Sequence, residues 1–127
     1  MFYDLKQYER AIDDYNKAIQ LNPNYVEAYY NRGLAYTGLG QYERAIVDCN
    51  KAIELNPNPA VAYLGRGLAY AKLKQYERAI SDFNKTIQLN PNLAEAYVGR
   101  GLCYKLLGDN TKAQADFAKA KQLGYKG

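Results

Sequence analysis

Three arginines recur with a fixed period and could bind an acidic ligand or form internal ion pairs: Arg32, Arg66 and Arg100. Three aspartates follow the same period: Asp48, Asp82 and Asp116. A guanidinium matches a carboxylate in charge and geometry, so the arginines form either a ligand-binding ladder or a set of pairs with these aspartates. Because Asp116 is kept in the last repeat, we expect each arginine to pair within its own repeat, and not with the aspartate of the preceding one.

The sequence offers no set of side chains for catalysis or cofactor binding. Histidine, the commonest general base and metal ligand, is absent. The hydroxyl residues have no base nearby in sequence: Thr37, Ser81, Thr86 and Thr111. The recurring glycines are each followed by leucine and lack the Gly-Lys-Ser run of a phosphate loop, so close helix packing explains them: Gly33, Gly67 and Gly101. We therefore predict a protein that is not an enzyme and that has no cofactor.

The two cysteines, Cys49 and Cys103, stand at positions where other repeats carry core residues. Cys49 aligns with Tyr15 and Phe83, and Cys103 aligns with alanines. A free cysteine at such a core position usually packs like a small apolar side chain. We predict buried free thiols in preference to a disulfide or a metal site.

Composition disfavours two further classes. The net charge is +4, but basic and acidic residues are interspersed in every repeat and form no basic stripe, so nucleic-acid binding is disfavoured. No apolar run long enough to span a membrane and no charged-then-apolar leader is visible. The default prediction is a soluble, cytoplasmic protein that does not contact a membrane.

The chain is built from one 34-residue unit, best seen from Ala28 to Pro57. Two amphipathic helical patterns, here called the front helix and the back helix, are joined by a turn at Gly40. The back helix shows the pattern most clearly, in Tyr42, Ala45, Ile46, Cys49, Ala52 and Ile53. The same period relates Pro23, Pro57 and Pro91. Such a period is typical of a stacked array, in which each unit buries its apolar face against its neighbours.

One unit carries Tyr63, Gly67, Tyr70, Ala79, Phe83 and Pro91 at its repeat positions. This succession of an aromatic, a small residue, a tyrosine, an alanine, an aromatic and a proline resembles the tetratricopeptide repeat family over nearly the whole chain. The resemblance implies an all-α fold of seven helices in about three and a half units. It also implies a right-handed superhelical solenoid with front helices lining the concave side. It says less about function, because this scaffold carries many different ligands.

We expect a single array made of a truncated repeat (1–24), two complete repeats (25–58 and 59–92) and a C-terminal capping repeat (93–127). Phe2 aligns with Tyr36, so the chain begins part-way through a unit, with the first back helix from about Gln7 to Leu21. In the last unit three apolar or aromatic positions become polar: Asn110, Gln114 and Lys121. Terminal repeats need such an outer face, so the array is expected to end here.

The junctions between units read Leu-Asn-Pro-Asn. The residue before a proline avoids helical angles, so the back helices should end near Leu21, Leu55 and Leu89. The second asparagine of each junction is the predicted N-cap of the next front helix: Asn24, Asn58 and Asn92. Glu27 and Glu95 would complete capping boxes, and Pro59 would take the first helical position.

A second apolar row on the front helices, offset from their packing face, is the candidate ligand-binding groove. With its small and basic neighbours it comprises Tyr30, Asn31, Leu34, Leu64, Leu68, Lys72, Val98, Leu102 and Lys105. The resemblance implies that this row lies on the concave surface. The first functional hypothesis is therefore a module that binds a peptide or helix of a partner protein there. Alternatively, the row is a ladder in which its leucines pack only on one another.

Two more specific ligands are disfavoured. The resemblance implies a possible clamp for the acidic C-terminal peptide of chaperones, made by Lys, Asn and Arg on successive front helices. Asn31 matches its asparagine, but Val61 and Gly65 stand where the later basic residues are needed. RNA reading by helical repeats requires base-reading side chains, which Gly65 and Gly99 cannot provide.

The second functional hypothesis is self-association through the N-terminal end. The first back helix lacks the front helix that its apolar residues are shaped to meet: Tyr8, Ala11, Tyr15 and Ala18. Left bare, these residues would form an apolar strip, which soluble monomers avoid. A homodimer that covers the strip is therefore the predicted alternative.

Overall fold

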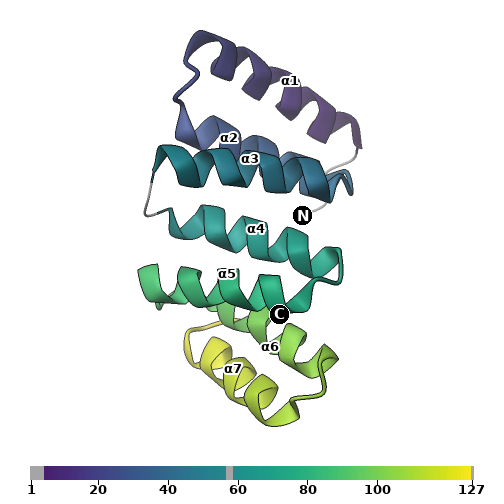
Figure 1. Ribbon diagram of the computed structural model, residues 1–127, viewed down its shortest axis with the longest axis vertical. Helices are drawn as coiled ribbons and strands as arrows, with labels where there is room; N and C mark the ends of the chain where they lie inside the picture. Colours follow the sequence, from purple (N-terminus) through teal and green to yellow (C-terminus); the bar gives the residue numbers. More distant parts are fainter. Residues whose placement is uncertain (1–4, 57–58, 127) are drawn as a thin grey trace.

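The computed structural model describes residues 5–56 and 59–126, and all regular secondary structure within them is α-helical (Figure 1). The helices are α1 (Leu5–Leu21), α2 (Val26–Gly38), α3 (Tyr42–Leu55), α4 (Ala60–Lys72), α5 (Tyr76–Leu89), α6 (Ala94–Leu106) and α7 (Asn110–Gln122). None of these helices is long and apolar enough to cross a membrane. The predicted all-α fold of seven helices is confirmed, while Phe2, which the repeat aligns with Tyr36, lies outside the described residues.

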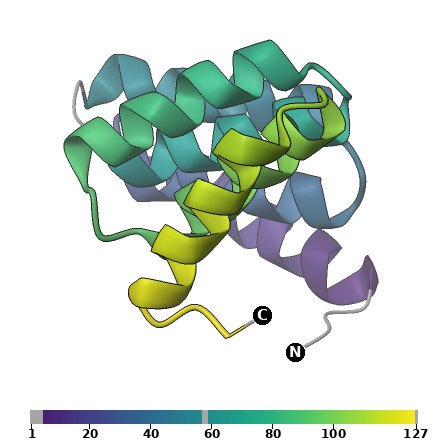
Figure 2. The same cartoon turned by 90° about the horizontal axis from the view of Figure 1, so that it is seen from below.

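The helices form a stack of hairpins that runs from α1 to α7 (Figure 1). Each front helix packs against the back helix that follows it, which gives the hairpins α2–α3, α4–α5 and α6–α7. Each back helix from α1 to α5 also packs on the next front helix, and neighbouring front helices touch. Figure 2 looks along the stack from the α7 end, with α1 behind. Within the described residues, α1 has no front helix of its own.

Each front helix ends in a tight turn that returns the chain as a back helix. After α2, the N–H of Gly40 donates to the carbonyl of Thr37 at 3.0 Å, and the N–H of Gln41 donates to that of Tyr36 at 2.9 Å. Gly40 has a φ of 77°, where only glycine avoids a steric cost. Lys74 takes the equivalent place after α4 with a φ of 64°. The predicted glycine turn is therefore confirmed after α2, and a lysine adopts the same geometry after α4.

The junctions between units differ in part from the prediction. The back helices end where expected, at Leu21, Leu55 and Leu89. The front helix α2, however, begins one residue later than predicted, so its N-cap is Tyr25. Asn24 instead donates its backbone N–H to the side-chain oxygen of Asn22 at 3.1 Å. The side chain of the first asparagine, Asn22, accepts the hydrogen bond that stabilises the turn, and the second, Asn24, lies before the start of the helix.

The N-cap predictions are therefore wrong for α2, α4 and α6. The N-caps are Tyr25, Pro59 and Leu93, and none makes a side-chain capping bond. Asn58 lies outside the described residues. Glu27 and Glu95 still stand in the first turns, where a carboxylate interacts favourably with the helix dipole.

The core lies between front and back helices, and among the described residues Phe83 of α5 is its largest fully buried side chain. Phe83 is fully buried between Gly67 of α4 and Gly99 of α6. A Cβ atom at Gly67 would lie 2.8 Å from the ring, and one at Gly99 would lie 2.5 Å from it. Both distances are shorter than carbon atoms pack. Close packing, predicted for Gly67, therefore explains both glycines.

The outer face of α7 is polar. Asn110, Gln114 and Lys121 are exposed, whereas Ala113 and Ala120 are buried. In α1 the counterpart of Gln114 is Ile12, which is buried. The positions that became polar in α7 are thus positions that face a following hairpin elsewhere in the array.

Candidate functional site

The recurring arginines pair with the aspartates of their own hairpins. Nε of Arg32 donates to Oδ2 of Asp48 at 2.8 Å, and Nη2 donates to Oδ1 at 2.7 Å. The same two-bond geometry, at 2.6–2.9 Å, recurs in Arg66–Asp82 and Arg100–Asp116. The pairing predicted from the shared period of the two residue types is confirmed.

A third hydrogen bond of each guanidinium crosses to the preceding back helix. Nη1 of Arg32, on α2, donates to Oδ1 of Asn16 on α1 at 2.8 Å. The equivalent bonds join Arg66 to Asn50 at 2.8 Å and Arg100 to Asn84 at 2.9 Å. Each arginine therefore links its front helix to both adjacent back helices. Sequence reasoning missed the asparagines, although they share the period of the arginines.

Burial shows that this arginine–aspartate ladder is structural. Asp48, Asp82 and Asp116 are each at most 5% exposed, and their arginines are half-buried. The hydrogen bonds to these aspartates raise the pKa of all three arginines, more than burial lowers it. The three arginines therefore stay positively charged. Because such pairs roughly break even in net stability, we assign them the role of fixing the register between hairpins.

The residues of the predicted groove fall into different environments. Leu34 and Leu102 are exposed, at 39% and 49%. Leu64 is buried in the cluster around Phe83, and Leu68 packs against the same cluster. Leu64 is therefore a core residue that a ligand cannot reach, and Leu68 is only partly available.

The other groove residues lie on the surface or at its edge. Lys72 and Lys105 are exposed in the last turns of α4 and α6. Tyr30, Asn31 and Val98 are half-buried. The exposure of the outer leucines of the row does not fit a closed ladder in which the leucines pack only on one another.

Two hollows, one at each end of the array, are lined by four residues of this row: Asn31 and Leu34 in one, and Val98 and Leu102 in the other. The C-terminal groove has a volume of about 820 Å³ and is lined by Val98 and Leu102 of α6, by Phe117 of α7 and by the segment after α7. The N-terminal groove has a volume of about 610 Å³ and lies between α1 and α2. Its lining residues are Gln7, Tyr8, Arg10, Ala11, Asp14, Tyr15, Asn31, Leu34 and Ala35. The structure thus does not gather the predicted row into one pocket.

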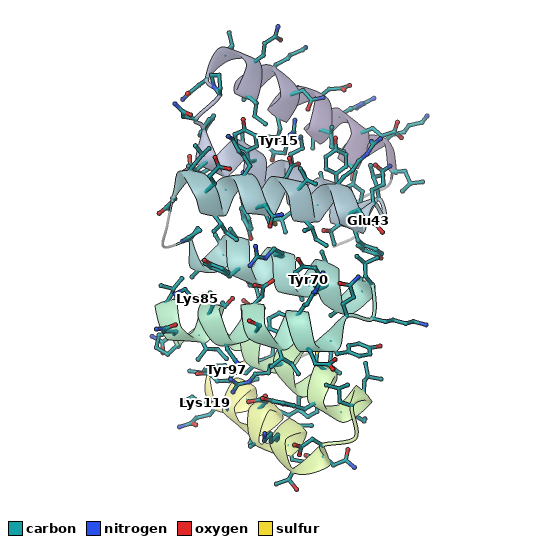
Figure 3. The ribbon with its side chains drawn as sticks, viewed as in Figure 1. Tyr15, Glu43, Tyr70, Lys85, Tyr97 and Lys119 are labelled. Carbon is teal, nitrogen blue, oxygen red and sulfur yellow. The ribbon has the colours of Figure 1, made fainter. Side chains whose placement is uncertain are left out.

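The residues predicted for self-association lie on α1, and most of them line the N-terminal groove. Tyr8, Ala11 and Tyr15 do so (Tyr15 is labelled in Figure 3), whereas Ala18 does not. All four are half-buried and not bare, because α1 packs on α2. The ring of Tyr8, for example, lies over Gly38. The predicted strip is therefore partly covered, and three of its four residues line the groove.

Both cysteines are buried free thiols, as predicted. Burial raises the pKa of Cys49 to about 12 and that of Cys103 to about 11. The thiolate is the reactive form, so neither side chain is a ready nucleophile at neutral pH. In residues 5–56 and 59–126, no group of three His, Cys, Asp or Glu side chains could hold a metal ion.

The positions that correspond to the chaperone-type clamp, Asn31, Val61 and Gly65, carry no positive charge. Asn31 lines the N-terminal groove, and Val61 is 43% exposed. Gly65 is buried, and a Cβ there would lie 3.3 Å from the sulfur of Cys49 and 3.4 Å from the ring of Tyr30. A long basic side chain at Gly65 would have no room without a shift of these neighbours.

Sequence profiles of one repeat family match most of the chain. A profile described as TPR repeat matches residues 1–40, and a tetratricopeptide repeat profile matches residues 26–59 and 60–93. Another tetratricopeptide repeat profile matches residues 83–115. A comparison with curated proteins finds no match.

Several solved structures share the fold. A crystal structure of MamA is 27% identical with a TM-score of 0.84, over 98% of this chain and 77% of that chain. A second MamA crystal structure is 33% identical with a TM-score of 0.82, over 91% of this chain and 63% of that chain. The second TPR of Spaghetti (RPAP3), bound to the HSP90 peptide SRMEEVD, is 29% identical with a TM-score of 0.76. That match covers 84% of this chain and 98% of the Spaghetti chain.

Proposed function

The chain belongs to the tetratricopeptide repeat family, and we propose that it is a non-enzymatic module that binds an apolar segment of a partner protein along its front helices. The observation that carries this proposal is the exposure of Leu34 and Leu102 at equivalent positions of α2 and α6. Exposed apolar side chains on a surface with hollows are typical anchors for a partner. The peptide bound to the Spaghetti domain supports protein binding by this fold, as an analogy.

The chemistry of the surface favours an extended apolar segment or an amphipathic helix over an acidic tail. Val61 and Gly65 supply no positive charge where a carboxylate clamp needs it, so Asn31 would act alone. Lys72 and Lys105 lie at the exposed ends of the front helices. They complement acidic residues that flank the apolar anchors of a ligand, and do not form its main binding site.

The available apolar area sets the strength of this binding. Full burial of a leucine side chain contributes about 1.5–3 kcal/mol before the costs of association. Leu34 and Leu102 are already partly buried, so the low end of this range applies to each. Two anchors alone therefore support weak binding. A tight ligand must also fill the C-terminal groove, where Val98 lies beside Leu102.

Selection of peptides from a displayed library on the immobilised chain tests this function. We expect the enriched peptides to carry apolar residues at helical or alternating spacing. Their affinity, measured by fluorescence anisotropy, should fall at least about tenfold on Leu102→Glu, since a charge replaces an anchor. The melting temperature should change little, because Leu102 is already about half exposed to solvent in the folded chain.

Val47→Glu is the matched control, because Val47 is 64% exposed on the back helix α3. It should leave peptide affinity unchanged. Leu68→Glu is a poor test, because Leu68 packs on the core and its replacement would also unfold the array. Enrichment of acidic C-terminal sequences only, or equal affinities for wild type and Leu102→Glu, would contradict the proposal.

A further inference from the structure

One side of the front helices, here called the front face, has a regular order of charged and apolar residues. Each front helix is followed by a back helix that runs the opposite way, so α2, α4 and α6 are parallel and begin at the same edge of the array (Figure 1). On α6 four side chains stand at i, i+3, i+7 and i+10, which is one side of a helix: Glu95, Val98, Leu102 and Lys105. The face of α6 is therefore acidic in the first turn, apolar in the middle and basic in the last turn.

Helices α2 and α4 each carry part of the same order. The face of α2 has the acidic end but no basic end: Glu27, Tyr30 and Leu34. The face of α4 has the basic end but no acidic end: Val61, Leu64, Leu68 and Lys72. Apart from the arginines of the ladder, the charges of these three helices thus lie at two opposite edges, with carboxylates at one and ammonium groups at the other.

The four charged residues at these edges are all exposed: Glu27, Lys72, Glu95 and Lys105. In residues 5–56 and 59–126 none of them forms an ion pair. Stabilisation of the helix dipole accounts for the carboxylates, since the internal back helices α3 and α5 also have acidic first turns. Those back helices, however, have no basic residue in their last turns. The last-turn lysines of α4 and α6 therefore point to a role in binding.

Helix α4 shows that both edges of the front face stay accessible inside the array. It has a front helix on each side, α2 and α6. Val61 in its first turn is nevertheless 43% exposed, and Lys72 in its last turn is exposed. Leu64, which lies between them on the face, is only 8% exposed. The exposure of the edges is therefore a property of an internal unit and does not depend on the first or the last one.

The acidic edge brings residues of α2 and α6 near one another. The pKa of Tyr30 on α2 is raised mainly by burial and additionally by the charge of Glu95 on α6. Such an effect requires a short separation between the two groups. A ligand that lies over α4 can therefore contact the charged residues of both neighbouring front helices.

We propose that the front face binds an amphipathic helix of a partner protein that lies antiparallel to α2, α4 and α6. The proposal rests on the proposed function and adds the charge order and the direction of the ligand. The first turn of the partner helix is acidic and faces Lys72 and Lys105, and its last turn is basic and faces Glu27 and Glu95. The helix dipoles favour the same direction, because the positive end of the partner helix meets the negative ends of the front helices.

The length of the face sets the length of the ligand. Glu95 and Lys105 stand ten positions apart, which corresponds to about 15 Å along α6. The acidic and basic turns of the partner helix should therefore be about three turns apart, with an apolar stripe between them. An extended segment would cover this distance in about five residues. It would lack the helix dipole, so a helix matches the face better.

A second copy of this chain is a poorer match. In a two-fold pair with antiparallel front helices, each front helix would meet its own counterpart. Glu95 would then face Lys105 of the other copy. Glu27, however, would face the uncharged last turn of α2, and Lys72 would face Val61. Two of the four charges would have no partner, whereas a separate helix can match all of them.

Two synthetic peptides of identical composition test the charge order. One has glutamates in its first turn, leucines along one side and lysines in its last turn, and the other has the two charged turns exchanged. A hydrocarbon staple on the opposite side keeps both helical, which circular dichroism verifies. In fluorescence anisotropy titrations at low salt, the acidic-first peptide should bind the full chain at least about tenfold tighter than the exchanged one. The two affinities should converge in 1 M salt, where the Debye length is about 3 Å.

The double variant Lys72→Glu with Lys105→Glu should bind the two peptides equally, because both edges of the front face are then acidic. The matched control is Lys6→Glu with Lys17→Glu, which changes the net charge by the same amount at exposed positions of the back helix α1. The control should keep the preference for the acidic-first peptide. A preference that persists in the double variant would overturn the assignment of the basic edge.

The outcomes separate this inference from the proposed function. Equal, salt-independent binding of both peptides to the wild type would overturn the charge order and leave apolar binding by the front helices intact. No binding of either peptide would overturn both. Sedimentation of the chain without peptide tests the second copy. A dimer that dissociates in the double variant would make another copy of this chain the occupant and would overturn the partner helix, whereas a monomer that prefers the acidic-first peptide would support it.

Discussion

The two ends of the array are both formed by back helices, yet they differ in how much of the repeat pattern they keep. Helix α7 carries Gln114 and Ala118 at the positions where α1 carries Ile12 and Asn16. Ile12 is buried, and Asn16 accepts a hydrogen bond from the next front helix. Helix α7 has therefore lost the residues that serve a following hairpin, and α1 has kept them.

The aspartates of the two ends show the opposite contrast. Asp116 of α7 is buried and held by Arg100, whereas Asp14 of α1 is exposed and has no arginine among the described residues. Residues that serve their own hairpin are thus present at both ends, but within residues 5–56 and 59–126 only α7 has its front helix. The comparison separates contacts within a hairpin from contacts between hairpins.

The largest difference between the interior and the N-terminal end should appear on truncation of equivalent aromatic residues. Phe83→Ala should lower the free energy of unfolding by about 3–5 kcal/mol, because the ring is fully buried and leaves a cavity. Tyr15→Ala, at the equivalent position of α1, should cost about 1–2 kcal/mol, because Tyr15 is half-buried beside an open groove. Urea unfolding measures both. Equal losses would show that the groove side of α1 is packed as tightly as the core.

The next largest difference concerns the ladder. Arg66→Ala should cost about 2–3 kcal/mol, because it leaves the nearly buried Asp82 unpaired. Asp14→Ala should change the free energy of unfolding by less than about 0.5 kcal/mol, because Asp14 is exposed. The two variants can be compared in the same urea titrations. A large loss on Asp14→Ala would mean that this carboxylate already has a structural role in the chain alone.

A smaller effect on stability is expected when a glycine that packs against the ring of Phe83 is replaced. Gly99→Ala should cost about 1–3 kcal/mol, because its Cβ would lie 2.5 Å from the ring of the buried Phe83. The equivalent position in α2 is Asn31, which lines the open groove. Asn31→Ala should be neutral or slightly stabilising, since alanine has the higher helix propensity. Differential scanning calorimetry would test the contrast, and a destabilised Asn31→Ala would show that the asparagine has a partner in the array.

The smallest effect concerns the turns. Lys74→Gly should stabilise the chain by about 0.5–1 kcal/mol, because Lys74 has a φ of 64°. Gly40→Ala, at the equivalent turn of the N-terminal hairpin, should destabilise it by about 1 kcal/mol for the same reason. Thermal melts followed by circular dichroism give both shifts. The two substitutions should change the melting temperature in opposite directions. A loss of stability on Lys74→Gly would show that the positive φ of Lys74 does not strain the backbone.

The regular period of the sequence made most of the fold predictable. It predicted the helices, their order and the aspartate partners of the arginines, because every unit makes the same packing contacts with nearly the same residues. The ends of the back helices also followed from local chemistry, since proline restricts the residue before it. The positions and ends of the helices depend on short-range geometry, and a repeated sequence gives the same local signal in each unit.

The N-caps and the groove could not be predicted in this way. Asn22 and Asn24 are both good capping residues, and only the folded turn decides which of them bonds to the other. Leu68 and Leu34 occupy the same repeat position of α4 and α2, yet Leu68 packs against the core cluster and Leu34 is exposed. Their difference depends on the neighbouring units. A residue's own repeat does not contain that information.

The most direct test of the account is to add a front helix before α1 in the same chain. A variant in which a copy of residues 26–35 replaces Met1 places an arginine four residues before Phe2, as Arg32 stands before Tyr36. A crystal structure of this variant should show the added arginine paired with Asp14 through two hydrogen bonds, as Arg32 pairs with Asp48. An added arginine that points into solvent, with the N-terminal groove still open, would contradict the account.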